Sequence, residues 1–143
     1  MDKRFFLLCG FLFFLGLYSG FVTSGESWRE EDVERFNEAI LESRQADAGE
    51  WTEDPLRVAL RFVGDFFDQE SRTVEVVRMR GAVPCVTVLV TDLGVKDDSI
   101  CDYRHRISLW RTEQGYWLLR SAESAWRCQP WRGHFWWSYA RCS

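Results

Sequence analysis

Apolar residues recur at helical spacing in the segment that follows Ser27. An S-x-x-E sequence begins at Ser27, and this capping box is typical of a helix N-terminus. Val33, Phe36 and Ile40 then follow at intervals of three and four residues, which places them on one helical face. The pattern predicts a first helix that starts directly after Ser27 and fades over residues 44–49.

A second helix start is marked by an acidic residue followed by proline. Asp54 can cap a helix, and Pro55 suits its first position, where no backbone N–H is needed. The apolar residues from Leu56 to Leu60 fit a helix and a strand equally well. The cap and the proline decide for a helix from Pro55 to about Phe67.

From Arg72 onward the sequence is rich in β-branched residues, and apolar positions alternate with polar ones. Four strands are predicted, over residues 72–80, 86–91, 103–111 and 116–126. The glycine-ended turn at residues 112–115 joins the last two as a hairpin. Two N-terminal helices followed by four antiparallel strands predict an α+β fold, with the helices packed on one face of a curved sheet.

The N-terminus reads as an export signal. Two basic residues precede Phe5–Val22, a run of 18 uncharged residues, and small or polar residues follow up to Ser24. This is the three-part pattern of a secretory signal, so we expect residues 1–24 to be cleaved and residues 25–143 to form one domain. Because 18 residues are almost enough to cross a bilayer, an uncleaved membrane anchor is the alternative. Either reading places the domain outside the cytoplasm, in the periplasm or secreted.

The cysteines agree with an oxidising compartment. Apart from Cys9 in the apolar run, four remain, and an even number in a small exported chain indicates two disulfides. Three pairings are open, and we expect Cys128–Cys142 with Cys85–Cys101, because each pair brackets one short loop. The chain has no C-x-x-C pair and only two histidines, so no metal site is expected.

Charge is divided unequally along the 143 residues. Residues 25–75 carry 15 acidic and 6 basic side chains, whereas residues 76–143 carry 6 acidic and 10 basic ones. The net charge from residue 25 onward is therefore negative, which argues against a nucleic-acid-binding protein. The basic half is rich in arginine, whose planar guanidinium stacks on aromatic rings and binds carboxylates.

The C-terminal segment combines these arginines with tryptophan. Six of the eight tryptophans fall within the last 34 residues, and residues 126–137 have neither helical nor strand periodicity. The segment therefore reads as a loop tied by the last disulfide. We expect a binding surface there for a protein or an acidic glycan, made of Arg127, Trp131, Arg132, His134, Trp136 and Trp137. The alternative is that the rings pack the end of the sheet and the arginines stack on them.

Signals for catalysis are sparse. His105 in the third predicted strand is the one weak catalytic candidate, with Asp102 or Glu123 as its acidic partner. The sequence has no G-x-S-x-G, H-E-x-x-H or phosphate-loop motif, and no cofactor is expected.

Two resemblances follow from these segments. The helices followed by the long hairpin of residues 103–111 and 116–126 resemble the closing half of the nuclear-transport-factor-2-like (SnoaL-like) cone over residues 29–127. That resemblance implies a pocket between sheet and helices, although the cone's third helix is missing. The sequences at Trp51–Leu56 and Arg127–His134 resemble those of small exported bacterial proteins without assigned function.

The leading hypothesis is therefore a non-catalytic exported domain that binds its partner through the C-terminal surface. One alternative is a pocket enzyme of the cone type that uses His105 with an acid. The other is a purely structural envelope protein retained in the membrane by residues 5–22.

Overall fold

The computed structural model describes residues 26–65, 68–79, 81 and 83–143. The predicted leader, residues 1–24, lies outside this part of the chain. Among the described residues, no helix combines the length and the apolar character needed to cross a bilayer.

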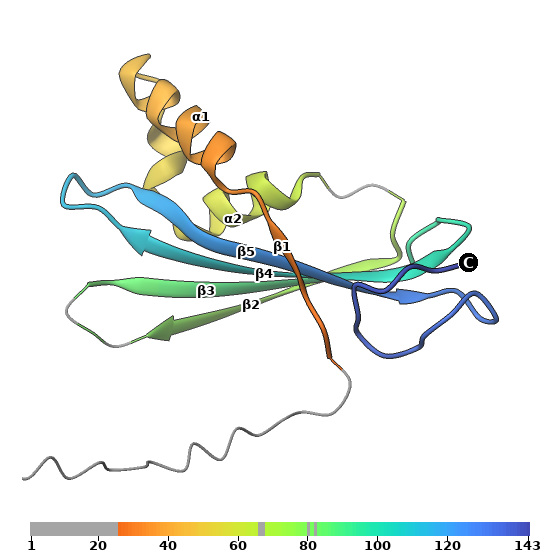
Figure 1. Cartoon of the computed structure of the whole chain (residues 1–143). Coiled ribbons are helices and arrows are strands. Elements are labelled where there is room, and N and C mark those ends of the chain that lie inside the picture. Colours follow the sequence, from red (N-terminus) through yellow and green to blue (C-terminus); the bar gives the residue numbers. More distant parts are fainter. Residues whose placement is uncertain (1–25, 66–67, 80, 82) are drawn as a thin grey trace, which may run out of the picture.

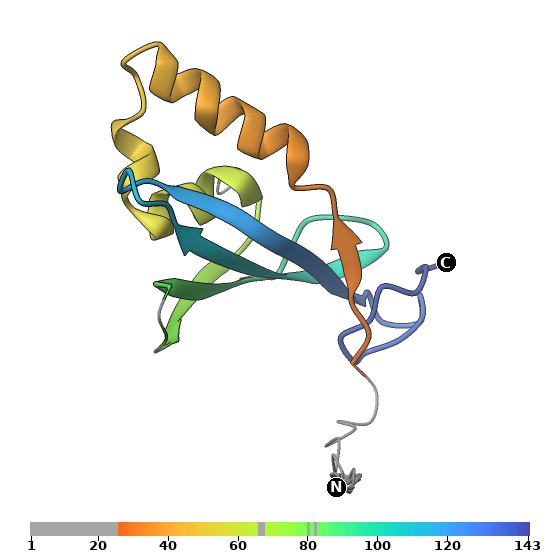
Figure 2. The same cartoon turned by 60° about the vertical axis from the view of Figure 1, so that its left-hand side comes forward.

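Two helices pack on one face of a five-stranded antiparallel sheet (Figures 1 and 2). The helical elements are α1 (Glu34–Gln45), the 3-10 turn η1 (Glu50–Glu53) and α2 (Pro55–Val63). The strands are β1 (Arg29–Glu31), β2 (Ser71–Met79), β3 (Cys85–Leu93), β4 (Ile100–Arg111) and β5 (Trp117–Cys128). Their spatial order is β1-β5-β4-β3-β2, with every neighbouring pair antiparallel. The α+β prediction and its four long strands are confirmed, but the sheet has a fifth strand.

That fifth strand, β1, occupies the positions at which the capping box predicted the first helical turn. The Ser27 hydroxyl lies 2.9 Å from that of Ser138 and does not cap a helix, and β1 pairs with the edge of β5. The helix α1 begins at Glu34, whose N–H donates to Asp32 Oδ1 at 2.9 Å. Strand pairing satisfies backbone donors and acceptors on both strands, and the stabilisation from these hydrogen bonds outweighs the local capping preference.

The helix α2 begins as its sequence predicts. Asp54 accepts a hydrogen bond from the Leu56 N–H at 2.9 Å, and Pro55 occupies the first helical position. The helix ends at Gly64, whose φ of 94° is a left-handed conformation that favours glycine. The described helix is therefore shorter than predicted, and Phe67 lies outside the described residues.

The apolar core lies between the helices and the covered face of the sheet. Ile40 of α1, Val58 of α2, Val88 of β3 and Ile107 of β4 are fully buried in it. Asn37 fixes α1 on β5, because its side-chain amide donates to the Leu119 carbonyl and accepts from the Leu119 N–H, both at 2.9 Å. Burial of these side chains stabilises the fold by about 1.5–3 kcal/mol each.

The other face of the sheet, here called the open face, carries arginines on β4 and aromatic rings packed against them. On β4, Arg104 and Arg106 alternate with the core residue Ile107 and so point to this face. Arg106 Nη2 lies 2.7 Å from Glu123 Oε2, and the guanidinium carbon of Arg106 stacks 4.4 Å from the ring centroid of Trp28. Ion pairs and cation–π contacts therefore cover the β4–β5 part of this face, whereas Val77 of β2 stays exposed.

Candidate binding site

A disulfide ties the C-terminal segment back onto the end of the sheet. Cys128 ends β5 and is bonded to Cys142, which confirms the predicted pairing. Backbone hydrogen bonds join Trp126 and Ser138 in both directions, at 2.9 and 3.1 Å. We call residues 129–142 the C-terminal loop. It lies at the end of the sheet away from α1 (Figures 1 and 2).

Part of this loop is buried. The side chain of Trp137 is only 9% exposed, and the guanidinium carbons of Arg104 and Arg127 lie 4.2 and 4.6 Å from its ring centroid. Trp126, whose backbone pairs with Ser138, is buried as well, and its indole N–H donates to the Ala140 carbonyl at 2.9 Å. These rings pack the end of the sheet, as the alternative interpretation of the segment expects.

His134 is also buried, and it holds the loop from inside. Its Nδ1 and Nε2 atoms lie 2.9 Å from the carbonyl oxygens of Trp136 and Ala140. Carbonyl oxygens only accept, so the tautomer of the imidazole decides which of the two carbonyls receives a hydrogen bond. Its ring and the sulfurs of Cys128 and Cys142 lie within 4.8 Å, but sulfurs joined in a disulfide are not the thiolates that a metal needs.

Another part of the loop presents aromatic rings to solvent. Trp131 is 100% exposed, Phe135 is 80% exposed and Trp136 is 48% exposed. Trp131 also has a φ of 70°, an uncommon conformation for a bulky residue. Strained backbone of this kind clusters at ligand sites, and a large exposed apolar side chain marks a place of contact.

A cavity of about 650 Å³ lies beside Trp131 and Phe135, where β4 begins and β5 ends. Its lining combines the two most exposed aromatic side chains with polar groups of the sheet and with the turn between them. The lining residues are Cys101, Asp102, Arg127, Cys128, Gln129, Pro130, Trp131, Gly133 and Phe135.

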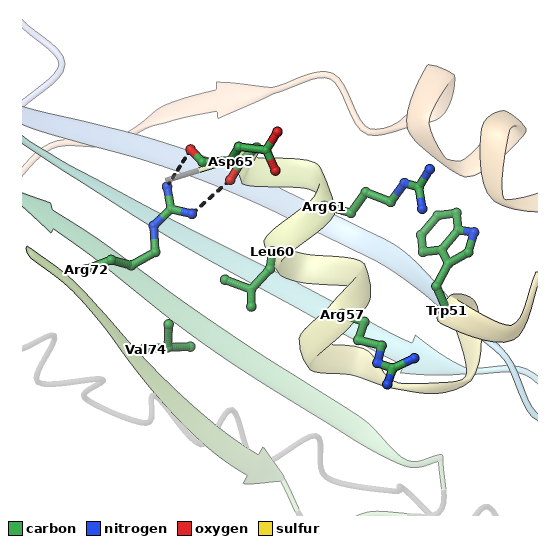
Figure 3. A pocket seen from close by; sticks show the side chains of 8 residues that line it. Trp51, Arg57, Leu60, Arg61, Asp65, Arg72 and Val74 are labelled. Atoms are coloured by element: carbon green, nitrogen blue, oxygen red, sulfur yellow. Dashed lines mark hydrogen bonds between the residues drawn. The ribbon is translucent and has the colours of Figure 1, made fainter. Parts of the chain in front are cut away.

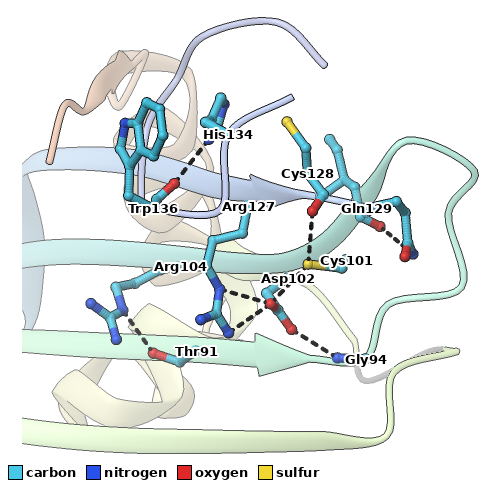
Figure 4. A network of polar contacts seen from close by, with 11 residues as sticks. Thr91, Gly94, Cys101, Asp102, Arg104, Arg127, Cys128, Gln129, His134 and Trp136 are labelled. Atoms are coloured by element: carbon cyan, nitrogen blue, oxygen red, sulfur yellow. Dashed lines mark hydrogen bonds and ion pairs between the residues drawn. The ribbon is translucent and has the colours of Figure 1, made fainter. Parts of the chain in front are cut away.

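An ion pair forms the polar side of the cavity (Figure 4). Asp102 Oδ2 accepts from Arg127 Nε at 2.8 Å and lies 2.7 Å from Arg127 Nη2. The other oxygen, Oδ1, accepts from the Gly94 N–H at 3.0 Å. The side chain of Asp102 is 10% exposed and that of Arg127 is 35% exposed, so the guanidinium reaches solvent.

The Cys101 thiol faces the same carboxylate. Its Sγ lies 3.0 Å from Asp102 Oδ2 and 3.3 Å from the Cys128 carbonyl oxygen. Burial, reinforced by the hydrogen bond to the Asp102 carboxylate, raises the pKa of Cys101 to about 11. The thiol is therefore protonated at neutral pH and is a poor nucleophile.

The predicted Cys85–Cys101 disulfide is not present in the structure, where both thiols are free. The strand register gives the reason: Cys85 stands opposite Trp110, nine residues along β4 from Cys101. At ~3.3 Å per residue the two cysteines are roughly 30 Å apart, far beyond the ~7 Å limit for a disulfide. The two cysteines are close in sequence, but they stand at opposite ends of the antiparallel β3–β4 pair.

The structure separates His105 from the two acids proposed as its partners. His105 lies two residues before Ile107 on β4 and so shares the covered face with it. Asp102 points to the open face. Glu123 is paired with Arg106 on that open face as well. The sheet therefore stands between the histidine and both acids.

On the covered face, His105 has other neighbours. Burial lowers its pKa below the usual value, and the carboxylates of Asp92 and Glu31 oppose that change only in part. Glu31 itself accepts from the Ser124 hydroxyl at 2.5 Å. Burial raises the pKa of Glu31, but the hydrogen bonds from Ser124 and Arg29 outweigh it and leave the pKa lowered.

The structure therefore divides the predicted binding residues into three groups. Arg127 and Trp131 line the cavity, while His134 and Trp137 are buried and support the loop. Trp136 is exposed beside the cavity, and Arg132 is exposed with its Nη1 donating to the Ser143 carbonyl at 3.2 Å.

Sequence reasoning missed several residues of the cavity, and only one of them carried a usable signal. Phe135 lies between two residues of the predicted surface and could have been included. Asp102, Cys101 and Gln129 carried no such signal, because their place at the cavity follows from the β4–β5 register.

Comparisons with known proteins found no match: no family model matches this chain, and neither does a curated protein or a solved structure. The resemblance to the nuclear-transport-factor-2-like cone therefore stays a prediction.

Proposed function

We propose that this chain is an exported, non-catalytic binding domain that holds a sugar residue of an acidic glycan in the cavity beneath Trp131. The observation that carries the proposal is the fully exposed indole of Trp131 on a cavity whose polar side contains the Arg127 guanidinium. Export is the part of the proposal that rests on the sequence of residues 1–24.

The two kinds of lining residue suit two parts of a sugar acid. The aromatic rings of Trp131 and Phe135 offer apolar faces on which the C–H face of a sugar ring can stack. A guanidinium has five N–H donors, and Asp102 engages Nε and Nη2 of Arg127. The remaining donors of Arg127, whose side chain is 35% exposed, suit a carboxylate or a hydroxyl of the sugar.

The shape of the site favours a glycan over a flat protein surface. Small ligands bind in concave sites with apolar walls and a few polar groups, and a cavity of about 650 Å³ is within their range. The second candidate, a protein partner, is favoured by Trp136, which is exposed but does not line the cavity. Exposed aromatic clusters are typical centres of protein interfaces.

Calorimetric titration with an oligogalacturonide, a chain of uronic acid residues, tests the proposal. We expect saturable binding that weakens tenfold or more in Trp131→Ala and in Phe135→Ala, because each loses a stacking face. A neutral oligosaccharide of equal length should bind more weakly, since it has no carboxylate for Arg127.

The matched control is Tyr139→Ala, which removes an exposed ring of the same loop that does not line the cavity. It should bind as the wild type does. The proposal fails if the oligogalacturonide does not bind, or if Tyr139→Ala weakens binding as much as Trp131→Ala does.

A further inference from the structure

A second, larger hollow lies between α2 and β2 and shares no lining residue with the cavity of the C-terminal loop. We call it the α2–β2 groove, and its volume is about 980 Å³. Figure 3 shows it from close by. Its lining residues are Trp51, Arg57, Leu60, Arg61, Gly64, Asp65, Arg72 and Val74.

The floor of the groove is apolar. Leu60 of α2 points toward Val74 of β2 across the hollow (Figure 3), and these two side chains form the apolar floor. The indole of Trp51 lies on the other side of α2, beside Arg61, and lines the groove there. Val74 is 37% exposed although it lies on the face that the helices cover elsewhere. The outer strand β2 therefore extends beyond the helices and leaves part of this face open to a ligand.

The rim of the groove is cationic. Arg57 and Arg61 are one helical turn apart on α2, so they lie on the same side of the helix. The Arg61 guanidinium carbon stands 4.5 Å from the ring centroid of Trp51, so its charge lies against the face of that indole. The nearest ion-pair partner of Arg57 is Asp54 at 3.9 Å, and both side chains are at least half exposed, so that pair is weak.

Arg72 closes one end of the groove and contributes little net charge there. Its Nε and Nη2 donate to the two oxygens of Asp92, at 2.6 and 2.9 Å, and its Nη1 donates to the Gly64 carbonyl at 2.8 Å. These bonds join the end of α2 to β2 and β3. Asp65 also lines the groove, so its lining side chains carry three positive charges and one negative charge, and Asp92 offsets the charge of Arg72. The lining keeps a net positive charge, which Arg57 and Arg61 supply.

We propose that the α2–β2 groove binds a fatty carboxylate, with the acyl chain on the floor and the carboxylate at Arg57 and Arg61. Each part of the groove needs the matching part of such a ligand. A small inorganic anion would leave the apolar floor in water, and an uncharged chain would leave the two guanidinium groups without a partner. This site goes beyond the glycan site and does not depend on it.

Calorimetric titration of the whole domain with laurate and with 1-dodecanol below their critical concentrations tests the charge requirement. Laurate should bind at one site, and the alcohol of equal chain length should bind at least tenfold more weakly. Acetate, which has the charge but not the chain, should show no measurable binding. The inference is overturned if the alcohol binds as tightly as laurate, or if laurate does not bind.

Two pairs of variants locate the site. Arg57→Gln should weaken laurate binding several-fold, whereas Arg35→Gln, at an exposed position of α1, should not change it. Val74→Ser should also weaken laurate binding. Val77→Ser should leave laurate binding unchanged, because Val77 is exposed on the opposite face of the same strand. Equal effects within either pair contradict the assignment, as does binding only to anionic phospholipid vesicles and not to monomeric laurate.

Discussion

Trp131 and Trp137 stand six residues apart in one disulfide-tied loop, yet their surroundings are opposite. Trp137 is 9% exposed and has arginine guanidinium groups at 4.2 and 4.6 Å from its ring. Trp131 is fully exposed and stands at the edge of a cavity. The difference shows that one part of the loop is an extension of the core, and that this part holds the other part out to solvent.

The largest effect on stability is expected from Trp137→Ala. Removal of a buried aromatic ring typically costs about 3–5 kcal/mol of unfolding free energy, because the ring leaves a void. Trp131→Ala should change the free energy by no more than about 0.5 kcal/mol, since its ring is in solvent. Urea denaturation followed by far-UV circular dichroism measures both values. Equal losses in the two variants would contradict the division of the loop into a supporting half and a presenting half.

The next largest effect is expected from removal of the disulfide. The double variant Cys128→Ser with Cys142→Ser opens a loop whose ends are 14 residues apart, and the chain-entropy account predicts a loss of about 3 kcal/mol. Ligand binding should fall with it, because the same bond positions Trp131. Thermal unfolding of the variant measures the loss, with Cys85→Ser as the control for a thiol that is free. An unchanged melting temperature would show that the loop is held without the bond.

A smaller, pH-dependent effect is expected at His105, in a region that the ligand does not touch. Burial depresses its pKa in the folded protein, so the unfolded chain takes up a proton first as the pH falls below about 6.5. The stability of the wild type should therefore decrease from pH 7.5 to 5.5, and His105→Asn should lose less over that interval.

Urea titrations at three pH values measure this difference, and glycan binding at pH 7.5 should be the same in both proteins. Parallel pH profiles would show that His105 is not buried in its neutral form.

The sequence predicted those parts of the fold that local patterns determine. The start of α2 follows from a cap and a proline at Asp54–Pro55, and the four long strands follow from alternation and turns. The Cys128–Cys142 bond was predictable because its loop really does return to its own start. In each of these cases, neighbours in sequence are also neighbours in space.

The sequence predictions fail where the local structure depends on residues that are distant in sequence. The S-x-x-E signal at Ser27 gave way to pairing between β1 and β5, about 95 residues away along the chain. The pairing of Cys85 with Cys101 failed because the β3–β4 register separates them. Trp131 and Trp137 lie in one segment that has neither helical nor strand periodicity, so only the fold decides which of them faces solvent.

The indole N–H resonances of the tryptophans, assigned with single variants, test the central claim most directly. When the oligogalacturonide is added to the folded domain, the Trp131 resonance should move progressively until it saturates. The resonances of Trp126 and Trp137 should stay in place, because these rings are buried. A Trp131 resonance that stays unchanged while the glycan binds, or a larger shift at Trp137 than at Trp131, would contradict the account.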